Sequence, residues 1–356
     1  MRKIENHSSC DQKMKDKALR SNGENYIMQP LTVKNLSLKN RLVLPPMASG
    51  KPNAMGQVTD AVVRYYEEKS HGGYLSLIIV EHSYISPEGK AHANQLSVSR
   101  DSDVEGLRRI AKAIHDNGSS AILQISHAGA ATSEKITGFP SIGPSRECGL
   151  VKFLPEREMT VQDMQTVVSA FADAACRAMA AGFDGVEVHS AHGYLLNQFY
   201  SPLTNRRTDT YGGSTENRIR LHLEITQAVR SVIGDDKALL LRLGACDYMD
   251  GGSSIADAVT VAKLLEKAGL DILDVSGGMS GFTVKGMEKI EGYFQSETEA
   301  IKKEIALPVI LTGGITHGET TEKLLAEKKA DLIGIGRAML RDAHWAEKVF
   351  NANMLN

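Results

Sequence analysis

Eight short apolar runs recur along the chain and limit what it can fold into. They span residues 41–48, 75–82, 120–127, 185–189, 238–245, 271–277, 308–314 and 331–336. Each is rich in valine, isoleucine or leucine, and most lack the polar alternation of a strand with one solvated face. Such runs are typical of strands that are covered on both faces, as in a parallel sheet. We therefore predict eight buried parallel strands.

Amphipathic helical patterns lie between these runs. In residues 160–182, apolar side chains recur every three or four positions, which is the spacing of one helix face. Thr160 with Asp163 has the pattern of a capping box, and a glycine follows the last turn. Residues 101–118 and 253–269 have the same design. The sequence therefore alternates strands with helices.

This alternation predicts an α/β fold, a single-domain (β/α)8 TIM barrel. We place the barrel over residues 26–356 and expect a polar, mobile extension over residues 1–25. The alternative is an open doubly wound sheet. A GxGxxG motif would support that alternative, but "LPPMASG" follows the first strand instead.

Composition excludes several classes of protein. The chain has 41 basic and 43 acidic residues, a formal net charge of −2, which does not favour nucleic acid or an anionic membrane as a partner. It has no apolar stretch long enough to span a membrane and no secretory signal. Its four cysteines lack the CxxC spacing of zinc or iron–sulfur sites. We expect a cytoplasmic protein and leave a homo-oligomer open.

Polar residues stand at or just past the carboxyl ends of several predicted strands. They are Gln124, His127, His189, Arg242 and Gly314. In TIM barrels this end carries the chemistry, because the loops that follow the strands meet there. The sequence therefore places a functional site at this end.

The last two predicted strands both end in glycine. Gly313, Gly314 and Gly336 would let backbone amides approach an anion closely, and Arg337 would add a bidentate partner. The alternative is ordinary turns beside a surface arginine. We favour a phosphate site, which strands 7 and 8 of such barrels commonly frame.

Two polar side chains interrupt apolar strands. Arg242 and Gln124 would offer a fixed positive charge and a donor–acceptor amide on the same barrel face. Together they could bind a flat heterocycle with an imide edge and stabilise an anion formed on it. The alternative for Arg242 is a structural ion pair inside the barrel.

The segment "GVEVHSAHGY" places two histidines three residues apart, followed by a tyrosine. His189 and His192 could bind a metal with His127 and Asp209, but the spacing is no recognised metal motif. They could also be a packed core pair. We favour a pair that binds a substrate oxygen, with Tyr194 as proton donor, and predict no metal.

At this point the residues resemble a known family. The segments "PLTVKNLSLKNRLVLPPMA", "LQISHAG", "HSAHGYLLNQF", "SPLTNRRTDTYGGSTENRIR" and "IGIGRAML" are similar to those of the Old Yellow Enzyme family of FMN-dependent NAD(P)H:flavin oxidoreductases, or ene-reductases. The resemblance runs from Pro30 to the C-terminus, and it also implies a (β/α)8 barrel. The "RTDTYGGSTENR" block is its most specific part.

The resemblance implies a role for each candidate residue. The residues that would hold FMN are Pro45, Pro46, Met47, Ala48 and His82 around the ring, Gln124 at the pyrimidine edge, Arg242 beside N1, and Gly314, Gly336 and Arg337 at the phosphate. His189 and His192 would bind the substrate's oxygen, and Tyr194 would protonate the α-carbon of the substrate. Many members have a threonine or cysteine at the position of Ala48 that bonds the flavin, and alanine cannot make that bond.

The mechanism implied by the resemblance is ping-pong. NAD(P)H would reduce FMN and leave, and a small activated alkene, such as an α,β-unsaturated carbonyl compound, would then receive the hydride from the flavin and a proton from Tyr194. Two alternatives stay open at this stage. One is another FMN barrel chemistry, such as oxidation of a small amine or ether, and the other is a non-catalytic flavin-binding barrel.

Overall fold

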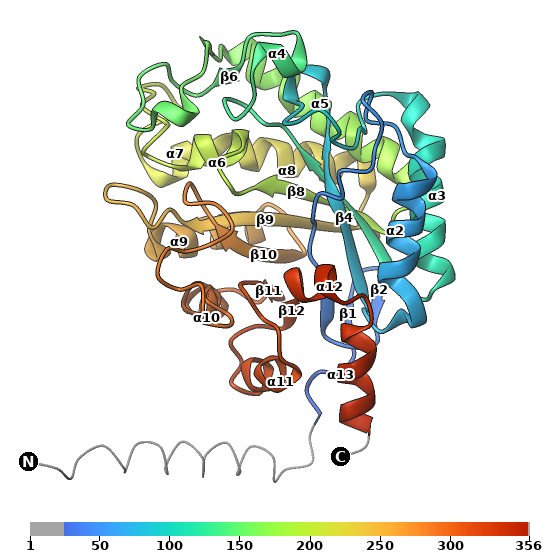
Figure 1. Ribbon diagram of the computed structural model, residues 1–356. Helices are drawn as coiled ribbons and strands as arrows, with labels where there is room; N and C mark the ends of the chain where they lie inside the picture. The colour runs from blue at the N-terminus through green and yellow to red at the C-terminus, as the bar shows by residue number, and fades with distance from the viewer. Residues whose placement is uncertain (1–24, 355–356) are drawn as a thin grey trace, which may run out of the picture.

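The computed structural model describes residues 25–354. Eight parallel strands close into a barrel in the order β10-β11-β12-β3-β4-β5-β8-β9 (Figure 1). They are β3 (Leu42–Leu44), β4 (Leu77–Tyr84), β5 (Ser120–Ser126), β8 (Gly185–Ser190), β9 (Ala238–Cys246), β10 (Ile272–Gly277), β11 (Val309–Leu311) and β12 (Leu332–Gly334). Each forms within one of the eight apolar runs or overlaps it closely. The closed barrel confirms the predicted (β/α)8 fold.

The predicted extension over residues 1–25 lies outside the described residues except for Asn25. The boundary between the extension and the barrel therefore stays a prediction. Within residues 25–354, no helix combines the length and the apolar character that crossing a membrane requires.

Helices surround the barrel (Figure 1). The longer ones are α2 (Asp60–Ser70), α3 (Val104–Asp116), α5 (Val161–Ala180), α8 (Arg220–Ile233), α9 (Ile255–Lys267), α10 (Gln295–Lys302), α11 (Gly318–Ala326) and α13 (Trp345–Met354). Short helices lie in the connections: α4 (Glu134–Thr137), α6 (Leu195–Tyr200), α7 (Thr215–Arg218) and α12 (Arg337–Arg341). The capping box predicted for α5 is present, since Thr160 accepts from the Asp163 amide and Asp163 accepts from the Thr160 amide.

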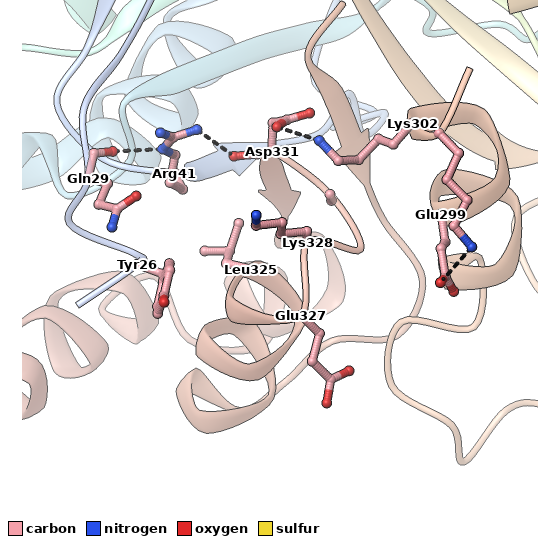
Figure 2. Close-up of a pocket in the computed structure, with 11 residues that line it drawn as sticks. Tyr26, Gln29, Arg41, Glu299, Lys302, Leu325, Glu327, Lys328 and Asp331 are labelled. Atoms are coloured by element: carbon pink, nitrogen blue, oxygen red, sulfur yellow. Dashed lines mark hydrogen bonds and ion pairs between the residues drawn. The ribbon is translucent and has the colours of Figure 1, made fainter. Parts of the chain in front are cut away.

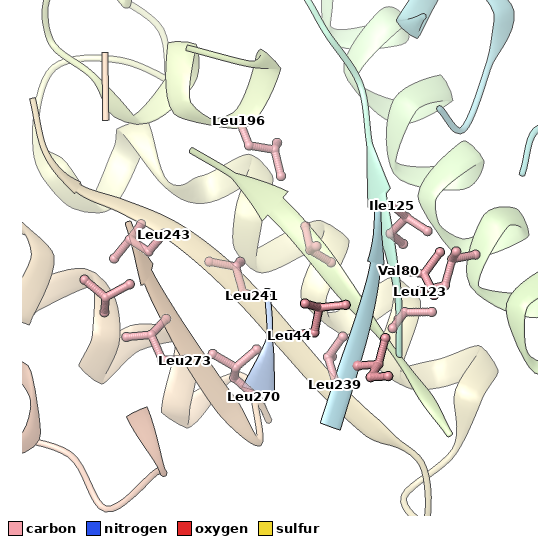
Figure 3. Packing of buried hydrophobic residues seen from close by; sticks show 14 of the residues in the cluster. Leu44, Val80, Leu123, Ile125, Leu196, Leu239, Leu241, Leu243, Leu270 and Leu273 are labelled. Atoms are coloured by element: carbon pink, nitrogen blue, oxygen red, sulfur yellow. The ribbon is translucent and has the colours of Figure 1, made fainter. Parts of the chain in front are cut away.

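The main core lies between the strands and the helices (Figure 3). Leu123, Leu241 and Leu273 point outward from their strands and are fully buried. They belong to one cluster with helical side chains such as Phe171 and Val229, which are equally inaccessible. Burying a side chain of this size stabilises the fold by about 1.5–3 kcal/mol relative to exposure. This explains why the strand sequences are apolar on the outward face.

The barrel interior is apolar at the amino ends of the strands. Val43, Leu77, Ile122 and Leu240 form a separate cluster there with other interior side chains. An antiparallel hairpin, β1 (Leu31–Val33) with β2 (Leu36–Leu38), adds Leu36 and Leu38 to this cluster. No sequence pattern indicated this hairpin. Because it packs against the amino-end cluster, it leaves the carboxyl end as the face open to ligands.

A polar layer follows toward the carboxyl ends. Gln124 is in register with Glu187, and Arg242 is in register with both His189 and Asp274. All five side chains are buried. The barrel therefore changes from an apolar to an ionisable interior along its axis, and this change positions the site.

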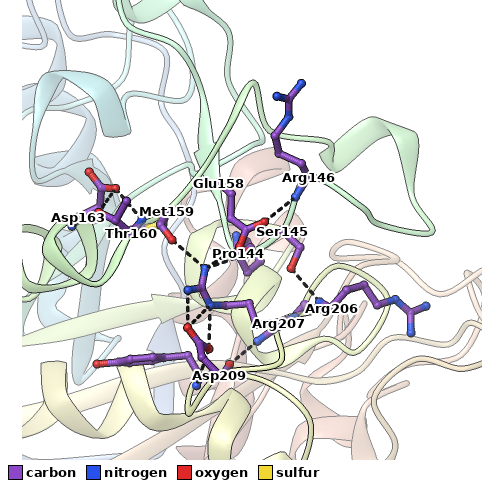
Figure 4. A network of polar contacts seen from close by, with 12 residues as sticks. Pro144, Ser145, Arg146, Glu158, Met159, Thr160, Asp163, Arg206, Arg207 and Asp209 are labelled. Atoms are coloured by element: carbon purple, nitrogen blue, oxygen red, sulfur yellow. Dashed lines mark hydrogen bonds and ion pairs between the residues drawn. The ribbon is translucent and has the colours of Figure 1, made fainter.

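The two long connections at this end are tied together by Arg207 (Figure 4). A small parallel sheet, β6 (Ile142–Gly143) with β7 (Arg157–Glu158), lies in the connection after β5. The Arg207 guanidinium donates to the carbonyl oxygens of Pro144 at 3.0 Å and Met159 at 2.8 Å, both in this connection. It also donates to Asp209, which follows β8. Asp209 thus stabilises a loop and does not join the histidines.

Candidate functional site

Four aromatic side chains, from two strands and the loop after one of them, meet at the carboxyl end of the barrel. His189 lies near the end of β8, and its ring centroid lies 5.2 Å from that of His192 and 5.0 Å from that of Tyr194. His82, near the end of β4, lies 5.4 Å from Tyr194 and 6.2 Å from His189. The structure therefore brings together the three residues predicted for the substrate and one predicted for the cofactor.

A tight turn gives this geometry to the His–Gly–Tyr segment. His192 and Gly193 have φ values of 59° and 76°, and the Tyr194 amide donates to the Ala191 carbonyl at 3.1 Å. Positive φ at both central positions is the pattern of a type I′ turn. A β-carbon on Gly193 would lie 2.3 Å from the Phe153 ring, so only glycine fits there. The left-handed conformation of His192 costs on the order of 1–2 kcal/mol, which neighbouring contacts must offset.

Those contacts come from α6 and β10. Asn197 accepts from the Gly193 amide at 2.8 Å, and Gln198 donates to the Gly193 carbonyl at 2.7 Å. The His192 amide donates to the Gly277 carbonyl at 3.2 Å. On the side chain, His192 Nε2 lies 2.8 Å from Ser276 Oγ. Ser276 thus orients the imidazole of His192, a role that the sequence analysis missed.

The surroundings keep these rings uncharged. Burial lowers the pKa of His189 and of His192 well below the ordinary value, and the positive charge of Arg242 adds to the effect. Burial raises the pKa of Tyr194 to about 12. The phenol therefore keeps its proton at neutral pH, and the imidazoles are neutral hydrogen-bonding groups. A neutral acid and neutral donors beside one another suit protonation of a basic carbon centre.

The polar layer beneath them has a fixed arrangement. Gln124 Nε2 donates to Glu187 Oε1 at 2.8 Å, and Arg242 Nε lies 3.2 Å from Asp274 Oδ2. The ion pair considered as the alternative for Arg242 is therefore present. Burial raises the pKa of Glu187, with Asp274 adding to the shift, and burial also raises that of Asp274. The carboxyl groups of Glu187 and Asp274 lie beside the single guanidinium of Arg242. If the two carboxyl groups share one proton, the net charge of these three side chains is zero.

Several buried polar atoms of this layer have no hydrogen-bond partner among the described residues. They include Glu187 Oε2, His189 Nδ1 and Asp274 Oδ1, whereas Arg242 Nε and Asp274 Oδ2 contact each other in their ion pair. Unpaired buried polar atoms are costly, and they point to a ligand or to ordered water. The donor and acceptor set of Gln124 with the charge of Arg242 fits the imide edge of an isoalloxazine ring. Glu187 and Asp274 were not identified from the sequence, because an acidic residue within a strand gives no signal without its partners.

The predicted phosphate residues also come together. A β-carbon on Gly314 would lie 3.1 Å from Arg337 Nη2, and one on Gly336 would lie 3.2 Å from Met47 Sδ. Gly314 has a φ of 73°, a conformation that glycine adopts readily. Arg337 is exposed, and its one hydrogen bond among the described residues is a long contact, 3.4 Å, with the Tyr293 hydroxyl. Side chains at the two glycine positions would clash with Arg337 and Met47. The space that the glycines leave beside the guanidinium fits a phosphate.

The loop after β3 borders the same face. Pro45 is buried, Pro46 and Met47 are partly exposed, and Ala48 is exposed. The next residue, Ser49, donates to Glu81 twice, from Oγ at 2.6 Å and from the amide at 3.1 Å. Glu81 lies in β4 and is fully buried, so it anchors this loop to the barrel. This anchor was also missed by the sequence analysis.

His127 does not join the His189 pair. Its Nδ1 accepts from the Gly129 amide at 3.0 Å, and its ring packs where a β-carbon on Gly89 would stand. Within residues 25–354, no three His, Cys, Asp or Glu side chains are arranged as metal ligands.

A cavity of about 560 Å³ lies at the opposite end of the barrel (Figure 2). It is bordered by Arg41 and Asp331, which precede β3 and β12. Several of its charged groups bind protein atoms. Arg41 donates to the carbonyls of Gln29 and Asp331, and Lys302 pairs with the Asp331 carboxylate. This cavity is separate from the predicted site.

Comparison with known proteins gives a consistent result. The model of the NADH:flavin oxidoreductase / NADH oxidase family matches residues 26–356. An NADH oxidase from Thermoanaerobacter brockii is 39% identical over 320 residues, which cover 88% of this chain and 49% of the relative. An NADPH dehydrogenase from Clostridium acetobutylicum is 37% identical over 321 residues, covering 90% of this chain and 93% of the relative. The chain thus spans about half the length of the first relative and almost all of the second.

Solved structures agree. A 2-naphthoyl-CoA reductase in complex with 2-naphthoyl-CoA has a TM-score of 0.85 and 27% identity, covering 92% of this chain and 52% of that one. A morphinone reductase variant in complex with tetrahydroNAD has a TM-score of 0.78 and 25% identity, covering 93% and 92%. An Old Yellow Enzyme homologue from Zymomonas mobilis, at 24% identity and a TM-score of 0.79, supports the fold.

Proposed function

This chain belongs to the NADH:flavin oxidoreductase / NADH oxidase family, of the Old Yellow Enzyme type, and from this we propose that it reduces activated carbon–carbon double bonds. The family uses FMN with NAD(P)H as electron donor, which confirms both the predicted resemblance and the predicted cofactor. The substrate class proposed here is a small α,β-unsaturated carbonyl compound. The observation that carries the proposal is the convergence of His189, His192 and Tyr194 on the face that borders the predicted cofactor residues.

The cofactor is proposed to lie across the mouth of the barrel. Gln124 and Arg242 would hold the pyrimidine edge of FMN, while Gly314, Gly336 and Arg337 would hold its phosphate. Pro45, Pro46, Met47, Ala48 and His82 would border the ring. When bound, FMN supplies the hydride chemistry that no amino-acid side chain provides. The orphaned atoms of the polar layer support this placement.

The histidine pair is proposed to bind the carbonyl oxygen of the substrate. Both imidazoles are neutral, so each offers one N–H donor and one acceptor nitrogen. Hydrogen bonds to the oxygen draw electron density from the conjugated double bond and stabilise the negative charge that forms on the oxygen as the β-carbon is reduced. The enclosed site strengthens these bonds, because little water competes for the same oxygen.

Tyr194 is proposed to donate the proton to the α-carbon. Its phenol is still protonated well above neutral pH, and it lies edge to face against His189. A carbon centre beside an enolate is strongly basic, so a weak acid is sufficient. The backbone turn at His192 and Gly193 fixes the phenol relative to the imidazoles.

The names of two similar structures, a 2-naphthoyl-CoA reductase and a morphinone reductase, support a reductive reaction. A cytoplasmic location is part of the same proposal, since the cysteines at 148, 176 and 246 are free thiols.

The test is a half-reaction experiment. Purified protein loaded with FMN is mixed anaerobically with NADH or NADPH, and the visible flavin absorbance is followed. We expect bleaching, and then recovery when cyclohexenone is added. Bleaching without recovery for any of a panel of enones would instead favour oxidation of an amine or ether, and a flavin that never bleaches would favour a non-catalytic barrel.

A further inference from the structure

His82 stands in an irregular part of β4. The register pairs Val80 with Leu123 and Ser83 with Ile125, so β4 has one more residue than β5 between these two pairs. Such a β-bulge redirects side chains, and bulges are frequent beside active sites. Here Glu81 turns toward α2, where the Tyr66 hydroxyl lies 3.3 Å from its carboxylate. The ring of His82 packs instead beside Tyr194 and His189.

The side-chain amide of Gln95 contacts Nδ1 of this imidazole. Gln95 Nε2 lies 2.7 Å from His82 Nδ1. Gln95 follows β4 on a segment that pairs with the end of β4 in parallel, since the Tyr84 amide donates to the Leu96 carbonyl at 2.9 Å and the Val98 amide donates to the Tyr84 carbonyl at 3.1 Å. This backbone pairing, and not the length of the side chain alone, places Gln95 beside His82.

The orientation of the amide follows from its other contacts. The Ala91 amide donates to Gln95 Oε1 at 2.6 Å, and a backbone N–H can only donate. The oxygen of the side chain is therefore turned toward Ala91, and its nitrogen faces His82. Of the two N–H groups on that nitrogen, one points to the nearest acceptor, His82 Nδ1 at 2.7 Å, and the other is shared between the His82 carbonyl at 3.2 Å and Ser126 Oγ at 3.3 Å. Every polar atom of the Gln95 side chain is thus engaged.

A donor opposite Nδ1 determines the tautomer. Because Gln95 Nε2 donates, Nδ1 of His82 must accept, and the single proton of the neutral ring is on Nε2. The ring is partly exposed, on the same face as Tyr194. The charged or titratable groups that face it are His92, His189, His192, Tyr194 and Arg242. None of them is an anion at neutral pH, so nothing among them favours an imidazolium.

We propose that Gln95 is a positioning residue that holds His82 as its neutral Nε2–H tautomer, and that this N–H donates to an acceptor atom bound at the mouth of the barrel. The acceptor is a carbonyl oxygen or ring nitrogen, of the flavin or of the substrate. Ala48, on the loop that follows the adjacent strand β3, has no polar side-chain atom, so His82 supplies a donor that this position cannot. The role toward a ligand rests on the proposed function, but the tautomer does not.

Burial supports the neutral state. It lowers the pKa of His82 to about 3, with His92 and Arg242 adding to the shift. The donor would therefore keep its proton and its neutral charge over the whole physiological range.

The first experiment measures the tautomer in the full chain labelled with 13C,15N-histidine, with the His82 signals assigned by their loss in His82→Gln. We expect the Nε2–H form from about pH 5 to about pH 8, the range in which an ordinary histidine titrates. In Gln95→Glu the group facing Nδ1 becomes an acceptor, so we expect the Nδ1–H form or an imidazolium that titrates in this range. A His82 that is Nδ1–H in the unaltered protein, or that is unchanged in Gln95→Glu, would refute the proposal.

A matched control separates this effect from that of a buried charge. Asn205 is buried like Gln95, and its side-chain amide contacts backbone groups at Phe199, Arg207 and Tyr211. Asn205→Asp should leave the His82 tautomer unchanged. Should Gln95→Glu fail to fold, Gln95→Met, which has similar volume and no donor, is expected to give a mixture of both tautomers.

The second experiment tests the donor with two replacements of His82. Glutamine places an amide N–H near the position of Nε2, whereas asparagine reaches only the position of Nδ1. We expect His82→Asn to change one of two quantities about tenfold, which is the effect of losing one hydrogen bond. His82→Gln should restore the value of the unaltered protein. One is the ratio of the affinities for oxidised and reduced FMN. A tenfold change in this ratio shifts the midpoint potential of the two-electron couple by about 30 mV. The other is the affinity for a phenol.

The two readouts distinguish the acceptor. If the midpoint potential changes and the phenol affinity does not, the acceptor atom belongs to the flavin. If the phenol affinity changes and the midpoint potential does not, the acceptor atom belongs to the substrate. If neither differs between His82→Asn and His82→Gln, the donor role is refuted. If the protein takes up no FMN, the proposed function fails, while the tautomer measurement still decides the role of Gln95.

Discussion

The imidazole of His189 and the phenol of Tyr194 meet edge to face, with ring centroids 5.0 Å apart and planes inclined at 79°. His189 lies one residue before the end of strand β8 and Tyr194 precedes helix α6, and the turn between them has two positive φ values. The proposed proton donor and the proposed oxygen-binding group are thus fixed relative to each other by the backbone.

Tyr194→Phe should slow alkene reduction and leave reduction of the flavin by NAD(P)H largely unchanged. A positioned general acid contributes roughly 10²–10⁴ in rate, and phenylalanine keeps the ring packing against His189 while removing the hydroxyl. Stopped-flow measurement of the two half-reactions checks this. Equal slowing of both would show that Tyr194 is not the proton donor.

His189→Ala should weaken binding of a phenolate ligand. A hydrogen bond to a charged oxygen contributes about 1.5–3 kcal/mol, so we expect roughly a tenfold to hundredfold loss of affinity, measured by titration of the flavin spectrum. His115→Ala is the control, because His115 lies on α3 and pairs with Asp184 away from the site. Unchanged affinity in His189→Ala would contradict the oxygen-binding role.

Arg337→Ala should weaken FMN binding but not riboflavin binding, since only FMN has the phosphate. The expected loss for FMN is roughly tenfold to a hundredfold, from the loss of a charge-assisted contact. Arg341 lies on the same helix α12 and is exposed, so Arg341→Ala is the matched control. Equal losses for both flavins would place the phosphate elsewhere.

Arg207→Lys should destabilise the protein by about 1–3 kcal/mol, because an ammonium cannot replace a fork that contacts Asp209 and the carbonyls of Pro144 and Met159. Denaturant unfolding measures the change. The adjacent Arg206 is exposed, so Arg206→Lys should be nearly neutral. Similar effects of both changes would argue against the role of Arg207 in joining the two connections.

His222 should make the protein less stable in acid. Burial lowers the pKa of His222 to about 3, and its Nε2 lies 2.8 Å from Ser190 Oγ. Between its unfolded pKa, about 6.5, and the folded value, the unfolded state binds more protons, so stability falls as pH falls. From about pH 6.5 to pH 5 this amounts to about 2 kcal/mol. His222→Gln should remove that part of the loss, measured as the free energy of unfolding at both pH values.

The contribution of His115 to stability should depend on pH in the opposite direction. Its hydrogen bond to Asp184 raises the pKa of His115, so its contribution to stability is present below the unfolded pKa and is lost as pH rises through the folded pKa. His115→Gln should therefore cost more stability at pH 5 than at pH 7.5. The same response in both variants would contradict the assignment for His222.

Much of the fold could be predicted from local pattern. A strand covered on both faces is apolar over most of its length, so each of the eight runs predicts its strand without knowledge of its neighbours. The Thr160–Asp163 capping box is also local and is present as predicted. The β1–β2 hairpin was missed, because three-residue strands give too short a pattern to distinguish from a loop.

The sequence by itself determined the barrel, the end at which the polar residues gather, and the identity of the candidate histidines and tyrosine, because these depend on order along the chain. Only the tertiary structure decided which polar atoms face one another. Gln95 meets His82, and Glu187 meets Gln124, through strand register, a bulge and barrel closure. Those are cooperative properties of the whole sheet, and a hydrogen bond requires them to be correct within a few tenths of an ångström.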